Sequence, residues 1–253
     1  MISRYEAYMD GQALSHVHPG IQIMDIAHSV SSVRRQMQSI ANRNGMVILS
    51  KAQDSTSVEI LFALRLYSIQ ERQAALQKIQ QWAQGSILET NDREGQRLHV
   101  VCDAFPTIQS ALGWTDVLSI QLTAYEKPFW ENKTPSVLVL NGSDTQGRLF
   151  VPGNAGDAFA EVTVTPQQTI HELTVIVADT MIRLEQLSTD QVITIGYDEH
   201  GYQYIKDGND SILSKRTAAS SDDLIAICGK KNTVSVQADN PVMAKIQVRG
   251  LWL

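Results

Sequence analysis

The chain has 253 residues, of which 43% are hydrophobic and 19% are charged, and its formal net charge is −6. This composition excludes a disordered chain and fits a folded protein with one large or two modest domains. Acidic residues outnumber basic ones 13 to 11 before Asn132 and 14 to 10 after it, which argues against a nucleic-acid-binding surface in either half.

The N-terminal segment and the cysteines bear on where the protein is made. Residues 1–11 lack the basic start and apolar run of a signal peptide, and no apolar stretch approaches the ~20 residues that span a bilayer. Cys102 and Cys228 lie far apart, among strand-forming residues and without zinc-site spacing. We therefore expect a chain made and folded in a cytoplasm, with two buried free thiols and no membrane span.

The first half begins with strand patterns. Ile21 and Ile23 alternate as in a strand. Residues 30–40 fit a helical spacing but have no convincing cap, and the turn-like Asn42-Arg43-Asn44-Gly45 leads into an apolar run at 46–49. We interpret this region as a β-hairpin rather than a helix.

One helix is predicted in this half, between strands. Ser68 is a candidate N-cap, and Glu71 completes a capping box. Gly85 gives the C-terminal stop, and the apolar stripe comprises Ala75, Leu76, Ile79, Trp82 and Ala83. The strands predicted around this helix cover residues 58–67, 97–104 and 118–125.

After Lys127-Pro128-Phe129-Trp130 the pattern is strand and turn only. Turns are predicted at 141–142, 152–154, 199–201, 207–209 and 239–241. The strands between them are 136–140, 159–165, 171–177, 181–185, 192–197, 202–206, 224–228, 233–238 and 242–252. Many short strands at this spacing predict an antiparallel sandwich. The fold class is therefore mainly β, with a β-barrel-like domain that carries one α-helix over 1–131 and a β-sandwich over 132–253.

Four residues near the N-terminus could be drawn as a metal cluster: His16, His18, Asp25 and His28. Their spacing fits no known loop motif. We expect exposed or hydrogen-bonded imidazoles and no metal.

Adjacent carboxylates offer no catalytic pair. In Asp198-Glu199 and Asp222-Asp223 the two neighbours point to opposite faces of a strand, so neither pair can flank one glycosidic bond. Asp207-Gly208-Asn209-Asp210 resembles part of a calcium loop, but Ala218 stands where that loop needs a glutamate. A solvated hairpin turn is the better interpretation.

The sequence shows no GxSxG, GxGxxG or P-loop motif, and neither cysteine has a local hydrolase signature. We assign no catalytic, cofactor-binding or metal-binding residue and expect a protein that is not an enzyme. Trp114, Trp130 and Trp252 could stack on sugars, although Trp252 and Trp130 fit core and junction packing better. A carbohydrate-binding module for host-surface recognition therefore stays open as an alternative, as does a hydrolase with a scattered site.

Six short segments follow one another in a characteristic order along the chain: Asn42-Arg43-Asn44-Gly45, Glu71-Arg72, Ile79-Gln80-Gln81-Trp82, Tyr125-Glu126-Lys127-Pro128-Phe129-Trp130, Gly229-x-x-Asn232-x-Val234 and Ile246-x-Val248-x-x-Leu251-Trp252. Their order and spacing over nearly the whole chain resemble the distal tail protein (Dit) of long-tailed phages that infect Gram-positive bacteria. Two departures stand out. Ala41 replaces the first hairpin glycine, and Ala160 lies near the place of an absent proline.

The resemblance implies a structural protein of the virion tail tip, made in the host cytoplasm. It implies a homohexameric ring whose N-terminal domains surround a channel, through which DNA passes without specific binding. It also implies galectin-like C-terminal sandwiches that dock a receptor-binding protein or other baseplate components. The expected partners are the tail tube protein and a tail-associated lysin or tail-fibre hub, without a cofactor.

Overall fold

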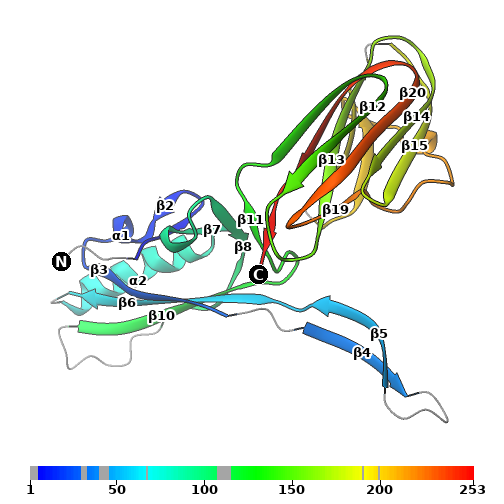
Figure 1. Cartoon of the computed structure of the whole chain (residues 1–253). Helices are drawn as coiled ribbons and strands as arrows, with labels where there is room; N and C mark the ends of the chain where they lie inside the picture. The colour runs from blue at the N-terminus through cyan, green and yellow to red at the C-terminus, as the bar shows by residue number, and fades with distance from the viewer. Residues whose placement is uncertain are drawn as a thin grey trace. The chain divides into compact units, whose positions relative to one another are not determined.

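A computed structural model of the chain describes residues 5–29, 33–39, 46–66, 68–106, 115–189, 191–198 and 200–253. The chain divides into two compact units, Met1–Trp130 with Leu253, and Glu131–Trp252. Both units are built mainly from β-strands (Figure 1). The predicted fold class, mainly β with a helix in the first half, is confirmed.

The first unit contains a four-stranded antiparallel sheet in the order β3 (Ile21–His28), β6 (Thr56–Arg65), β10 (Thr115–Ala124) and β9 (Val101–Ala104). In β6 the apolar residues recur at every second position, so one face of the sheet becomes the core. Ile60 lies opposite Ile120 in the ladder, and both are completely buried.

A second set of strands in this unit pairs in the order β2 (Gln12–Ala13), β1 (Ala7–Met9), β7 (Ile87–Thr90) and β8 (Gln96–His99). A short helix, α1 (Leu14–Val17), and a 3-10 turn, η1 (Asn91–Arg93), lie between them in the chain. The single strand predicted over 97–104 is wrong, because this segment forms two strands of different sheets. Val100 is buried and donates its N–H to Ser86 O, and there the chain leaves β8 and enters β9 of the other sheet.

Helix α2 (Ile69–Ala83) lies where the capping signal predicts it, along one face of the four-stranded sheet (Figure 1). The Ser68 hydroxyl accepts the Glu71 N–H at 3.1 Å, so the cap is formed. Ala75, Ile79, Trp82 and Ala83 are buried, as the stripe predicts, whereas Leu76 is only partly so. The buried face also includes Arg72, whose Nε donates to Leu66 O at 3.0 Å.

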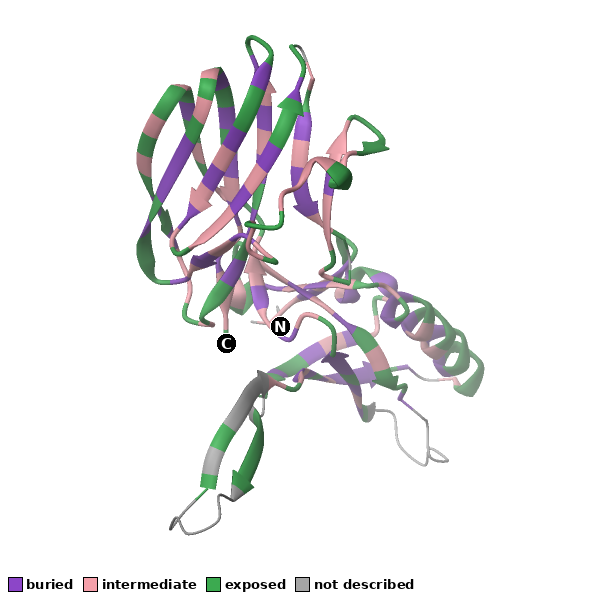
Figure 2. Cartoon of the chain, turned by 90° about the vertical axis from the view of Figure 1, so that its right-hand side faces the viewer, coloured by how far each residue is buried: buried purple, intermediate pink, exposed green. Residues whose placement is uncertain are grey.

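Strands β4 (Val33–Ser39) and β5 (Met46–Gln53) form a separate two-stranded ribbon, with a shift of register between Gln36 and Met37. The choice of a hairpin over a helix is therefore confirmed. The turn predicted at 42–45 lies outside the described residues. In Figure 1 the ribbon extends beyond the four-stranded sheet, and Figure 2 shows as exposed those of its residues whose burial is described, apart from the partly buried Gln53.

The second unit is a β-sandwich, built on the long strands β12 (Ser136–Val151) and β20 (Lys230–Val248). The other strands of its two sheets are β13 (Asp157–Pro166), β14 (Ile170–Val177), β15 (Thr180–Leu187), β16 (Ile193–Tyr197), β17 (Gln203–Asp207), β18 (Asp210–Ser211) and β19 (Ile225–Ile227). Between β18 and β19 lies the 3-10 turn η2 (Leu213–Lys215), and the short strands β11 (Trp130–Asn132) and β21 (Leu251–Trp252) pair with each other.

Figure 2 shows buried and exposed residues alternating along these strands. The inward residues form one apolar core within this unit, which runs from Leu140 to Val248. Its members come from both sheets, so the sandwich closes on a single shared core.

Two predicted turns are wrong. The chain does not reverse at Asn141-Gly142 or at Asp239-Asn240-Pro241, because β12 and β20 run on past both places. Gly142 pairs with Val242, but Asp144 pairs with Gln237, so the two strands bend together at a bulge. Beyond the bend β20 leaves β13 and pairs with β14. A single ribbon thus serves both sheets.

Candidate assembly surfaces

The histidines singled out in the sequence do not gather. His16 is exposed, and His18 accepts the Gly20 N–H on Nδ1 at 3.1 Å. Asp25 accepts the N–H of the next residue, Ile26. Within the described ranges no group of three or more His, Cys, Asp or Glu side chains is placed to hold a metal ion.

His28 instead joins a small polar cluster in the first unit that the sequence did not reveal. Its Nε2 lies 2.6 Å from Asp92 Oδ2, on the turn η1. The ring meets Trp130 edge to face at 5.4 Å between centroids, and the Arg93 guanidinium lies 5.1 Å from the centre of the same indole. Trp130 is thus held between a histidine and an arginine.

The electrostatics of this cluster favour an ionised Asp92. Burial by itself would raise its pKa, but the contact with His28 at 2.6 Å and the charge that His28 can carry bring the pKa below its ordinary value. Burial lowers the pKa of Arg93, although the negative charge of Asp92 acts in the opposite direction. The pair is suited to fastening β3 to η1.

Of the carboxylate pairs in the second unit, Asp222-Asp223 is described and is part of the surface, whereas Glu199 of the other pair lies outside the described residues. Asp222 is fully exposed and lies 3.8 Å from the Arg216 guanidinium. Burial, and then the charge of Asp222, raise the pKa of Asp223, and Arg216 opposes this. Asp207 accepts from the Gln191 side chain at 2.7 Å and lies opposite Asp210 in a tight hairpin, so the predicted turn is confirmed.

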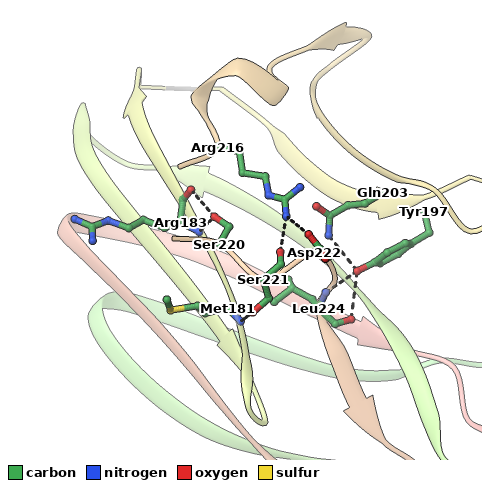
Figure 3. A network of polar contacts seen from close by, with 9 residues as sticks. All are labelled: Met181, Arg183, Tyr197, Gln203, Arg216, Ser220, Ser221, Asp222 and Leu224. Atoms are coloured by element: carbon green, nitrogen blue, oxygen red, sulfur yellow. Dashed lines mark hydrogen bonds and ion pairs between the residues drawn. The ribbon is translucent and has the colours of Figure 1, made fainter. Parts of the chain in front are cut away.

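A network of hydrogen bonds closes the open edge of β15 (Figure 3). Ser220 Oγ accepts the Arg183 N–H at 3.0 Å, and Ser221 Oγ accepts the Met181 N–H at the same distance. Arg216 holds this segment by donating to Ser221 O at 2.5 Å. The segment 216–221 therefore covers an edge that would otherwise be free to pair.

The other half of the network is centred on Tyr197. Its hydroxyl accepts the Leu224 N–H at 2.7 Å and a hydrogen bond from Gln203 Nε2 at 3.2 Å. Burial raises the pKa of Tyr197 above its ordinary value. Since the hydroxyl is already engaged in holding Leu224, the arrangement serves packing rather than acid–base chemistry.

Of the three tryptophans considered for sugar stacking, the two that the structure describes do not form a platform for sugars. Trp130 is 1% exposed, and Trp252 is partly buried with its Nε1 donating to Asn132 Oδ1 at 2.9 Å. Trp114 lies outside the described residues. Phe159, 45% exposed and stacked on Tyr197 with 4.2 Å between ring centroids, is an exposed aromatic side chain that no sequence pattern indicated.

Both cysteines are free. Cys228 is buried, as expected, whereas Cys102 on β9 is partly exposed. Burial raises the pKa of both thiols. Neither is therefore an activated nucleophile.

One pocket of about 340 Å³ lies beside α2 and is lined by Gln12, Val17, Lys78, Gln81 and Trp82. Lys78 is its only ionisable side chain, so the pocket has no acid–base pair. Within the described residues, no helix is both long and apolar enough to cross a membrane.

The features best suited to a function are sheet edges. The four-stranded sheet of the first unit ends in β3 on one side and β9 on the other, and no described strand pairs with either outer edge. The β4–β5 ribbon is also exposed, with Met37, Met46 and Ile48 more than half accessible. A two-stranded ribbon of this kind is marginally stable alone. Such edges are sites at which another chain can add a strand.

No family model and no curated protein matches the chain. Among solved structures, it is similar to the Dit protein of phage SPP1, described as a paradigm of the hub adsorption apparatus in phages that infect Gram-positive bacteria. The TM-score is 0.75 at 11% identity, over 97% of this chain and 98% of that one.

The chain is also similar to chains of the phage P2 baseplate in its activated conformation. With calcium the TM-score is 0.50 at 10% identity, over 99% and 98% of the two chains. With strontium it is 0.52 at 12% identity, over 97% of each. Over nearly its full length, the chain therefore has the fold of the SPP1 Dit protein.

Proposed function

We propose that this protein is a structural hub of a long-tailed phage or prophage, located at the distal end of the tail. The observation that carries the proposal is the match of nearly the whole chain to SPP1 Dit, through both units. A match to one unit would support only a shared module, because sandwiches serve many functions. The match over the whole chain supports the whole architecture.

The proposed assembly is a ring of six copies around a channel. Each copy has a sheet with one open edge at β3 and another at β9, so neighbours can meet head to tail through two different edges. Such a heterologous contact generates a closed ring when the rotation between neighbours closes. The exposed β4–β5 ribbon offers each copy a further contact to the next.

The ring would join the tail tube protein to a tail-associated lysin or tail-fibre hub. The C-terminal sandwiches would carry the receptor-binding protein or other baseplate components. DNA would pass through the channel without specific binding, in keeping with the net charge of −6. A non-enzymatic role agrees with the thiols of raised pKa and with the packing role of Tyr197.

Electron micrographs of the negatively stained protein, at high concentration or on addition of its tail tube protein, test this proposal. We expect rings with six-fold symmetry and a central hole. Single chains under both conditions, with no ring at the tail tip, would refute it. Absence of rings from the isolated protein alone would not, because some ring interfaces need a template.

The alternative, a carbohydrate-binding sandwich, now rests on one stacked pair, Phe159 on Tyr197. A glycan array separates the two functions. Specific binding that is lost in Phe159→Ala would favour the alternative, and an array without signal favours the hub.

A further inference from the structure

Strand β12 is an unusually long open edge in the second unit. It pairs with β20 along its whole length, from Ser136 opposite Val248 to Val151 opposite Lys230. The other edge of β20 is taken by β13 and then by β14, so β12 is the outermost strand of both sheets (Figure 1). In the part of the chain that the structure describes, no strand pairs with the outer edge of β12. Sixteen residues are far more than the short edge strands that natural sheets usually expose.

The direction of the backbone groups along β12 can be assigned. Leu149 O accepts from Asn232 Nδ2 at 3.5 Å, and Val151 O accepts the Gly229 N–H at 2.8 Å, so both carbonyl groups point toward β20. Backbone groups alternate in direction along a strand. Asp144, Gln146 and Arg148 therefore direct their N–H and C=O groups to the open edge. All three side chains are exposed.

We propose that this edge pairs with β12 of a second copy of the chain, antiparallel, about a two-fold axis that passes beside Gln146. In this register Gln146 lies opposite Gln146 of the second copy. Asp144 lies opposite Arg148 of the second copy, and the reverse pair forms symmetrically. All three residues direct their backbone groups to this edge, so each of these pairs is a hydrogen-bonded pair of the new ladder.

Charge complementarity selects a second copy as the partner. Within one strand Asp144 and Arg148 are four residues apart, about 13 Å, which is too far for an ion pair. Neither side chain makes an ion pair within the described residues. In the two-fold arrangement the Cβ atoms of Asp144 and of Arg148 of the second copy lie about 5 Å apart across the ladder, close enough for their side chains to form an ion pair. A parallel, in-register pairing would instead place like charges together.

The symmetry sets this contact apart from the proposed ring. A two-fold contact cannot form between successive neighbours around one six-fold axis. It joins two free chains, or one ring to a second ring. The inference therefore does not depend on the proposed function, and either can fail without the other.

Charge reversal tests the pairing in the full-length protein. Asp144→Arg places two arginines opposite each other, and Arg148→Asp places two aspartates together. Sedimentation equilibrium should show each single variant dissociating at a roughly tenfold or more higher concentration than the unaltered chain. The double variant, and an equimolar mixture of the two single variants, should recover the association. No recovery in either case, or equal association of all four samples, would overturn the proposal.

Cross-linking tests the position of the axis. Gln146→Cys, in a Cys102→Ser background, brings two thiols together at a Cα separation of about 5.5 Å, within the range of a disulfide. The matched control is Val139→Cys, which is 57% exposed on the same strand but lies far from its own copy in this register. Under mild oxidation we expect a disulfide-linked dimer from the first variant only. Equal cross-linking of the two variants, or no cross-linking of Gln146→Cys, would contradict the pairing of β12 with itself about an axis beside Gln146.

Discussion

The indole nitrogen of Trp82 donates a hydrogen bond to the main-chain oxygen of Gln12 at 2.7 Å. This bond ties α2 to β2, two elements that lie 70 residues apart in the chain. Trp82 is 5% exposed, so its ring also fills the core of the first unit.

Replacing Trp82 should therefore destabilise the protein strongly. We expect Trp82→Ala to lower the free energy of unfolding by about 3–5 kcal/mol, because it removes a large buried ring. Trp82→Phe keeps an aromatic ring but loses the hydrogen bond, which contributes about 1 kcal/mol. Urea denaturation measures both, with Tyr202→Ala, 73% exposed, as a control that should change little. A loss as small as that of the control would show that the ring is not packed in the core.

The N-cap of α2 gives a second test. Ser68→Ala removes the acceptor for the Glu71 N–H and should cost about 1 kcal/mol, whereas Ser68→Asn should retain most of the stability. Gln77→Ala, at an exposed position of the same helix, controls for helix propensity. The comparison is made by thermal unfolding followed by circular dichroism. Equal stability of the Ala and Asn variants would contradict the cap.

The Asp92–His28 pair predicts a dependence on pH. The pKa of Asp92 is lowered in the folded state, so its contribution to stability is fully present above the unfolded pKa of about 3.9. That contribution is lost as the pH falls through the folded value. We expect Asp92→Asn to be less stable than the unaltered chain above about pH 4 and to approach it as the pH falls further.

Urea titrations between about pH 2.5 and 5.5, followed by tryptophan fluorescence, measure this difference. Asp198→Asn is a suitable control, because Asp198 lies in the other unit. A difference between Asp92→Asn and the unaltered chain that stays constant through the acid range would contradict the ion pair.

The two units give a prediction about fragments. Residues 132–253 should fold alone, because the core of the sandwich is drawn entirely from this part of the chain. A first-unit fragment should be harder to isolate, since its sheet has two open edges. Circular dichroism and dispersed NMR spectra of the two fragments test this. An unfolded C-terminal fragment beside a stable N-terminal monomer would mean that the boundary is misplaced.

Local signals in the sequence predicted the elements that they control. The Ser68 cap and the stripe through Ala75, Ile79 and Trp82 gave the position of α2 and its buried face. The alternation in residues 58–67 gave β6. These signals depend only on residues that are close together in the chain, so they can be recognised in a single sequence.

Features set by distant residues could not be read in the same way. Asn141-Gly142 is a strong turn signal, but pairing with β20 carries the strand past it as a bulge. The cluster of His28, Asp92 and Trp130 joins residues that are 38 or more positions apart, and nothing in the spacing indicates it. The open edges are likewise properties of the whole sheet, because an edge exists only where no other strand pairs.

Native mass spectrometry of the full-length protein tests most directly the proposed assembly of this chain into a six-membered hub. The measurement is made over a range of protein concentrations, with and without the tail tube protein. We expect a complex of six 28.0 kDa chains, about 168 kDa, or twice that mass if two rings associate. Single chains or a simple dimer under every condition would contradict it.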